Sequence, residues 1–283
     1  MRDDPRDQLD AEGPVTPDDA EIEAWEGMAR VLTATGHFRV LRRFRPRARY
    51  AAADGVPKRT ALFVDVETTG LDTAADSIIE FAAVPFTYCP ATGTIYDVHP
   101  AYVALEDPGR PIPPAVVRLT GIADETVAGR RVDDGRVAAL VAGANLVLAH
   151  NAAFDWRFVT AEVERASGRR LDGRRLCTVR LSRKLLPQLR SRSLGYVAEW
   201  YGATRFAETY FEARHGRERP WRHSAAGDAV ATAHCLLRLL GDAADHGVTT
   251  WGALDRWLAG GTGTVRRRRR SAMPSGVRRD PEG

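Results

Sequence analysis

The sequence has few cysteines, no long apolar run and no secretory signal. The 283 residues include three cysteines, Cys89, Cys177 and Cys235, which are odd in number and far apart. That pattern excludes a disulfide framework and a zinc cluster, and it predicts a cytoplasmic protein. No apolar run approaches the roughly 18 residues that a membrane-spanning helix needs, so no membrane partner is expected. The N-terminus is acidic and lacks the apolar stretch of a signal peptide.

Positive charge is present, but it is unevenly distributed. The whole chain carries a net charge of +4. Residues 1–30 are net −7, residues 31–59 are net +7 and residues 262–283 are net +5, which leaves −1 for residues 60–261. A basic chain favours nucleic acid as a partner. Because the excess charge lies in the flanks, the function of the central body has to be argued from its residues.

The composition predicts four segments. Residues 1–20 are expected to be a disordered acidic N-terminus, and residues 261–283 a disordered basic tail. Residues 21–59 are expected to form a helix followed by a basic arm or linker, and residues 60–260 a folded domain. The arm and the run of five arginines at 266–270 either contact phosphates or are simply solvated, and the sequence leaves both possibilities open.

The body shows an order of elements that is typical of an α/β fold. Strands are expected at 61–66, 77–86, 94–103, 145–149 and 176–179. Helices are expected at 132–142, 153–167, 181–186, 193–201 and 227–240. Because consecutive strands come first and strands alternating with helices follow, the sequence predicts a mixed sheet flanked by helices.

Carboxylates stand where the pattern predicts buried structure. Asp65 and Glu67 lie two apart on a central strand, so their side chains share one face. Burying two neighbouring carboxylates is costly unless a divalent cation offsets the charge. The alternative is that the strand ends at Val64. Asp155 and Asp228 fall in expected first helical turns, where an acid also simply favours the helix dipole.

Taken together, three motifs resemble a known family. They read Phe63-Val-Asp65-Val-Glu67-Thr68-Thr69-Gly70-Leu71, then Leu148-Ala-His150-Asn151-Ala-Ala-Phe154-Asp155, then His223-Ser-Ala-Ala-Gly227-Asp228. Their order and spacing resemble the DEDDh 3′–5′ exonucleases of the ribonuclease H-like superfamily. Within that family the likeness is to the branch of the proofreading epsilon subunits of bacterial DNA polymerase III, which the segment Leu119–Ile122 also resembles. Residues 60–260 are then the exonuclease domain.

The resemblance implies a role for each matching residue. It makes Asp65, Glu67, Asp155 and Asp228 the ligands of two divalent metal ions, Mg²⁺ or Mn²⁺. It makes His223 the general base that takes a proton from the attacking water. It places five residues around the 3′-terminal nucleotide, namely Thr68, Thr69, Leu71, Asn151 and Phe154. For Phe154, packing within its own helix is an equal alternative to stacking on a base.

The expected function is therefore metal-dependent removal of nucleoside monophosphates from the 3′ end of DNA, with single-stranded or frayed ends preferred. The alternative is trimming of RNA 3′ ends or degradation of oligoribonucleotides. The expected partner is nucleic acid. Association with a DNA polymerase stays open. Because the region after Leu258 is basic and lacks an amphipathic stretch, a stand-alone repair or turnover enzyme is the favoured expectation.

Overall fold

The computed structural model describes residues 19–38, 40, 49–167, 174–204, 207–208, 211–212 and 221–260. The chain divides into two compact units, residues 1–43 and residues 44–283. In the first, the expected N-terminal helix is observed as α1 (Asp19–Ala34). The predictions for the acidic N-terminus, most of the basic arm and the arginine-rich tail lie outside the described residues.

A six-stranded mixed sheet forms the centre of the second unit. It consists of β1 (Arg59–Thr68), β2 (Ile78–Tyr88), β3 (Ile95–Val98), β4 (Tyr102–Leu105), β5 (Leu146–Ala149) and β6 (Arg174–Cys177). The order is β3-β2-β1-β5-β6, with β4 also pairing with β2. Strands β1 to β4 pair antiparallel, whereas β5 pairs parallel with both β1 and β6. This confirms the expected fold class.

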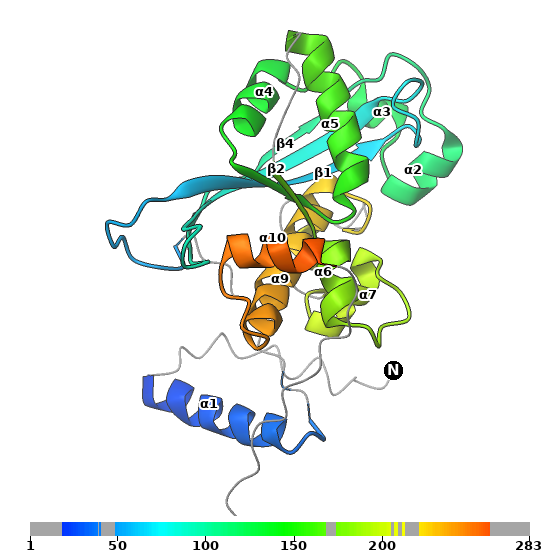
Figure 1. The fold of residues 1–283 in the computed structure, drawn as a ribbon. Helices are drawn as coiled ribbons and strands as arrows, with labels where there is room; N and C mark the ends of the chain where they lie inside the picture. Colours follow the sequence, from blue (N-terminus) through cyan, green and yellow to red (C-terminus); the bar gives the residue numbers. More distant parts are fainter. Residues whose placement is uncertain are drawn as a thin grey trace, which may run out of the picture. The chain divides into compact units, whose positions relative to one another are not determined.

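Helices cover both faces of this sheet (Figure 1). Helices α4 (Asp134–Ala142) and α5 (Ala152–Ser167) pack on one face. On the other face lie α6 (Thr178–Leu185), α7 (Leu194–Tyr201), α9 (Ala225–Ala244) and α10 (Trp251–Ala259). The side chains of β1 alternate accordingly: Leu62 and Val64 point into the α5 side of the core, and Ala61 and Phe63 into the α9 side.

The structure differs from the sequence expectations at several element boundaries. The expected strand 94–103 is two strands, β3 and β4, because Pro100 has no N–H to donate and interrupts the pairing. The expected strand 176–179 lies earlier, at Arg174–Cys177, and Val179 already belongs to α6. Helices α2 (Pro114–Thr120), α3 (Asp124–Val127) and α10 were not predicted. The first two are too short to show a helical period.

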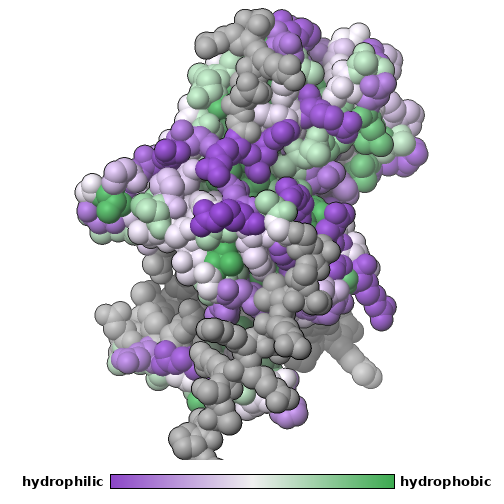
Figure 2. Space-filling model, in the orientation of Figure 1, coloured by the Kyte–Doolittle hydropathy of each residue, from purple (hydrophilic) through white to green (hydrophobic). Residues whose placement is uncertain are grey.

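One face of the second unit is drawn in Figure 2. Hydrophilic side chains gather across the middle of this face, with smaller hydrophobic areas between them. Among the exposed large apolar side chains of this unit are Leu71, Leu119 and Tyr196. None of the helices that the structure describes is both long and apolar enough to cross a membrane.

The start of α9 is held closely against the turn that precedes it. A Cβ atom on Gly227 would lie 2.1 Å from the main-chain oxygen of Trp221. No real Cβ makes such a contact, so only glycine lets the turn lie against the helix. Further along the same helix, a Cβ on Gly241 would meet nothing within 4 Å.

These two glycines predict opposite effects of the same substitution. We expect Gly227→Ala to lower the free energy of unfolding by about 1–3 kcal/mol, because the turn must shift. Gly241→Ala should raise it by up to about 1 kcal/mol, because alanine favours the helix. Urea denaturation followed by circular dichroism measures both. Equal effects of the two substitutions would contradict the close contact at Gly227.

Candidate active site

The first acidic pair lies on the central strand. Strand β1 continues through Asp65 and Glu67 to Thr68, which excludes the alternative that it ends at Val64. Both acids follow the alternation of Ala61 and Phe63, so they face α9. Asp65 is buried, with 8% of its surface exposed. Strand β1 pairs with β5 over Ala61–Phe63 and with β2 through both acids, so its backbone holds these two side chains in fixed positions.

The second motif brings Asp155 to the same end of β1. Strand β5 ends at Ala149, Asn151 turns the chain with a φ of 69°, and α5 begins at Ala152. Asp155 lies in the first turn of that helix and is buried. Its Oδ1 accepts a hydrogen bond from the main-chain N–H of Val66, 3.2 Å away, between the two acids of β1.

The third motif closes the cluster from α9. Asp228 lies in the first turn of α9 and is buried. Its two oxygens accept hydrogen bonds from the Arg222 guanidinium at 3.0 Å and from the main-chain N–H of His223 at 3.4 Å. One ligand atom each from Glu67, His223 and Asp228 lie within 4.8 Å of one another. The structure thus brings all three motifs to one place.

Burial and mutual repulsion shape the electrostatics of this cluster. Burial, followed by the charges of Asp155 and Asp228, raises the pKa of Asp65 well above its usual range. Burial raises the pKa of Asp155 and of Asp228 to about 7. Such a set of carboxylates cannot all ionise without a compensating cation. Hard oxygen donors suit Mg²⁺ or Mn²⁺, so the residues present fit a divalent metal.

His223 is the imidazole beside these acids. Burial, together with the neighbouring Arg222 charge, lowers its pKa. The ring is therefore neutral near pH 7 and has a lone pair that accepts a proton. His223 also has a φ of 59°, a left-handed conformation that is uncommon for a residue other than glycine.

Three of the residues expected around a terminal nucleotide lie at the end of β1 and in the turn after it, where two of them make hydrogen bonds within the turn and the third is exposed. The hydroxyl of Thr68 donates to the carbonyl of Gly70, and the hydroxyl of Thr69 donates to Asp76. Both hydroxyls therefore hold the turn after β1, and a position of these two residues beside a terminal nucleotide stays a prediction. Leu71 is 77% exposed at that turn, as an apolar contact to a base requires.

The other two expected substrate residues come from the second motif. Asn151 is exposed in the turn before α5. Phe154 is half-buried and packs on Phe158, with ring centroids 5.1 Å apart, so part of its surface serves helix packing. His150 is engaged by Thr178 and by the carbonyl of Arg192, and burial lowers its pKa to about 4.

Two residues of the site were missed in the sequence. Glu80 is 1% exposed, lies opposite Glu67 on β2, and accepts a hydrogen bond from the N–H of Ala225 at 2.8 Å. The only indication of Glu80 in the sequence was that it is a single acid inside the apolar run SIIEFAAVPF. Arg222 pairs with Asp228, and only its position next to His223 marked it in the sequence.

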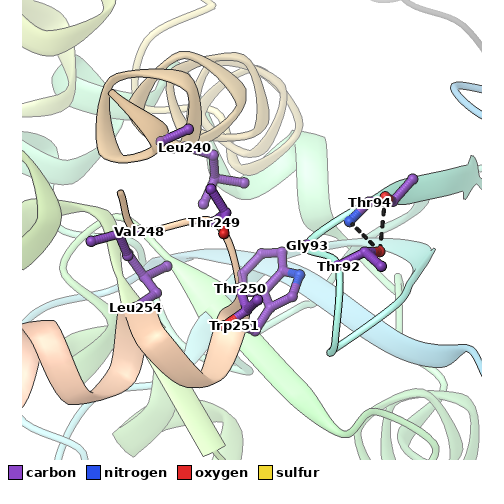
Figure 3. Close-up of a pocket in the computed structure, with 10 residues that line it drawn as sticks. Thr92, Gly93, Thr94, Leu240, Val248, Thr249, Thr250, Trp251 and Leu254 are labelled. Atoms are coloured by element: carbon purple, nitrogen blue, oxygen red, sulfur yellow. Dashed lines mark hydrogen bonds between the residues drawn. The ribbon is translucent and has the colours of Figure 1, made fainter. Parts of the chain in front are cut away.

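Figure 3 shows a separate cavity, of about 310 Å³, whose lining includes none of these residues. It is lined by the turn Thr92–Thr94, by Leu240 and Ala244 near the end of α9, and by Val248 to Trp251 and Leu254. Leu240 is twelve residues beyond Asp228 on α9, or about 18 Å at the rise of an α-helix. The lining has no ionisable side chain, so the cavity lacks the groups that hydrolysis needs.

The raised pKa values predict that, without metal, the protein loses stability as pH rises. An unfolded chain releases these protons near pH 4, whereas folded Asp155 and Asp228 keep them to about pH 7. Between those pH values, each proton that only the folded chain holds makes the free energy of unfolding fall by about 1.4 kcal/mol for every unit by which the pH rises. In EDTA, Asp155→Asn should have a shallower decline than the wild type between pH 5 and 7. Urea denaturation at each pH tests this, and equal slopes would contradict it.

Comparison with known proteins agrees with the three motifs. The model of the exonuclease family (RNase_T) matches residues 62–236. Over 201 residues the chain is 34% identical to a DNA polymerase III subunit epsilon-like protein of Rhodobacter capsulatus, covering 70% of this chain and 26% of that protein. It is 32% identical to the PolC-type DNA polymerase III of Bacillus subtilis, covering 72% of this chain and 13% of that protein.

A third relative is closer in length. The DNA polymerase III subunit epsilon of Aquifex aeolicus is 28% identical over 189 residues, which cover 66% of this chain and 83% of that protein. These matches confirm the family resemblance that the motifs gave. Because the family model covers more than half of the sequence, the chain belongs to the exonuclease family (RNase_T), a family of hydrolytic nucleases.

Proposed function

We propose that this chain is a metal-dependent 3′–5′ exonuclease that releases nucleoside monophosphates from DNA, preferring single-stranded or frayed 3′ ends. The observation that carries the proposal is the convergence of Asp65, Glu67, Asp155 and Asp228 with His223 from three distant motifs. The names of the relatives, which are DNA polymerase III proteins and subunits, favour DNA as the substrate.

The four carboxylates would hold two divalent ions, Mg²⁺ or Mn²⁺. Bound there, the ions would supply a Lewis acid for the phosphate and positive charge for the departing oxygen. The chain contributes the geometry. Asp155 is fixed by the N–H of Val66, and Asp228 by Arg222 and the N–H of His223. Fixed ligands need little reorganisation when charge develops in the transition state.

His223 would act as the general base. Its neutral ring takes a proton from water at one ring nitrogen, and the water oxygen forms the new bond to phosphorus. The bond from phosphorus to the 3′ oxygen of the preceding nucleotide breaks, and that oxygen keeps the electron pair and takes up a proton from solvent. The products are a nucleoside 5′-monophosphate and a strand that ends in a new 3′-hydroxyl. A neutral ring near pH 7 is what this step needs, and burial beside Arg222 favours that form by lowering the pKa of His223.

The turn after β1 would recognise the end of the strand. Leu71 is available to pack against the terminal base, since it is exposed. The hydroxyls of Thr68 and Thr69 would act indirectly, because they order the turn that presents Leu71. Asn151 and the exposed part of Phe154 would contact the same nucleotide from α5, and stacking on an aromatic ring contributes about 1–3 kcal/mol.

Removing the proposed base predicts a specific kinetic defect. We expect His223→Ala to lower kcat by about 10²- to 10⁴-fold, because general-base catalysis contributes that much. His99, an exposed histidine in the connection between β3 and β4, provides the control substitution to alanine. Isothermal titration with Mn²⁺ should give the same number of sites as in the wild type. A wild-type rate would contradict the base, and a lost Mn²⁺ site would make His223 a ligand instead.

Blocked oligonucleotides test polarity and substrate. We expect single-stranded DNA with a blocked 5′ end to be degraded in Mg²⁺, and the same strand with a blocked 3′ end to persist. Asp155→Asn should degrade neither, since it removes a proposed ligand. Matched RNA should be degraded more slowly. Faster degradation of RNA would favour the alternative of RNA 3′-end trimming, and degradation of the 3′-blocked strand would contradict the polarity.

A further inference from the structure

Glu80 is a fifth buried carboxylate beside the site. It lies on β2 directly opposite Glu67, and alternation along β2 gives it the same face as Ala82 and Val84, toward α9. It is more deeply buried than Asp65, with 1% of its surface exposed against 8%. Its charge also contributes to the raised pKa of Asp65 and of Asp228. Burying an ionised carboxylate this deeply is costly unless the group is paired or hydrogen-bonded, so its partners are informative.

One contact of Glu80 lies at the start of α9. The first N–H of that helix, on Ala225, donates to Oε2 of Glu80 at 2.8 Å. Ser224 occupies the N-cap position, where a serine normally accepts from the first turn. Here the Ser224 side chain makes no such bond, and its buried hydroxyl has no partner among the described residues. A carboxylate from β2 takes the place of the cap, where the helix dipole favours negative charge.

The contact between Glu80 and Ala225 lies between the motif of β1 and the motif at the start of α9, which together form part of the site. Asp228 lies one turn beyond Ala225 and donates its N–H to the carbonyl of Ser224, so its position follows the first turn of α9. His223 comes immediately before that turn and is bonded to Asp228 through its N–H. On the other side, β2 pairs with β1, which carries Asp65 and Glu67. Glu80 therefore links α9, which carries Asp228, to β2, the strand that is paired with the acids of β1.

We infer that Glu80 is a positioning residue, whose side chain tethers the first turn of α9 to β2 and so sets His223 and Asp228 opposite Asp65 and Glu67. The inference rests on the proposed function of those residues. The tether depends on an acceptor oxygen at the correct reach. A metal ligand or a purely electrostatic group would instead depend on negative charge at that position.

Two conservative substitutions separate reach from charge. Glu80→Gln keeps the length and an acceptor oxygen but removes the charge, whereas Glu80→Asp keeps the charge but is shorter by one methylene, about 1.5 Å. We expect Glu80→Gln to keep kcat within about threefold of the wild type. Glu80→Asp should lower kcat by about ten- to a hundredfold, because small displacements of reacting groups have effects of that size. KM for a single-stranded oligonucleotide should stay within about twofold in both.

Glu106 provides the matched control. It is another acid of the sheet region, half-buried, that accepts a main-chain hydrogen bond from a distant segment, the N–H of Val132. Glu106→Gln and Glu106→Asp should both leave kcat unchanged. Mn²⁺ titration calorimetry should give the wild-type number of sites in all four variants. Equal losses of kcat at Glu80 and Glu106 would reduce Glu80 to a structural role.

Other outcomes overturn the inference directly. A higher kcat for Glu80→Asp than for Glu80→Gln would show that charge matters more than reach, and a lost Mn²⁺ site in Glu80→Gln would make the residue a ligand. If Glu80→Asp does not fold, Glu80→Gln decides alone, since a loss of kcat above tenfold contradicts the tether. If the wild-type chain has no nuclease activity, the proposed function is wrong, but the inference about the Glu80 tether is not yet contradicted. Hydrogen exchange at the Ala225 amide then still tests the tether, with protection expected in Glu80→Gln and lost in Glu80→Asp.

Discussion

Repulsion among buried carboxylates is the constraint on which the rest of this structure depends. Asp65, Asp155, Asp228 and Glu80 are all nearly inaccessible to water, and Asp65 feels the charge of each of the others. Such a cluster opposes folding at neutral pH. The surrounding structure offsets part of that cost with main-chain donors, from Val66, His223 and Ala225, and with the guanidinium of Arg222. The same contacts also hold the carboxylates in place. They therefore both reduce the cost of burying these groups and set the geometry that a bound metal ion would need.

The architecture supplies further positive potential. Asp155 and Asp228 each lie in the first turn of a helix, and those helices pack on opposite faces of the sheet. Both helices therefore direct the positive end of their dipole toward the end of β1. Central strand β1 is paired with β2 through Asp65 and Glu67, and with β5 over the residues that precede them, which limits the movement of its acids. A rigid strand between two helix N-termini is a geometry that holds anionic side chains close together without a large loss of stability.

The sequence predicted those parts that follow from periodicity and motif order. Alternation placed Asp65 and Glu67 on one face, but the expected strand 61–66 stopped before Glu67, which the structure includes in β1. Glu80 was not identified because one acid in an apolar strand does not reveal a contact 145 residues away. The engagement of Thr68 and Thr69 with their own turn was also beyond the sequence, because a hydroxyl's partner depends on the folded loop. Pro100 divides the expected strand 94–103 into β3 and β4, as is usual for proline, which has no N–H to donate to a neighbouring strand.

The charge distribution has a physical explanation in the site. The body from residue 60 to residue 261 is nearly neutral although its proposed substrate is a polyanion. Four of its acids lie in one buried cluster, whose ionised form would repel phosphate in the absence of bound cations. On the proposed function, metal loading would therefore change the sign of the potential that an incoming 3′ end meets. Affinity for the terminal nucleotide would then depend on the bound cations and on an apolar contact such as Leu71, and a strongly basic surface on the body would be unnecessary.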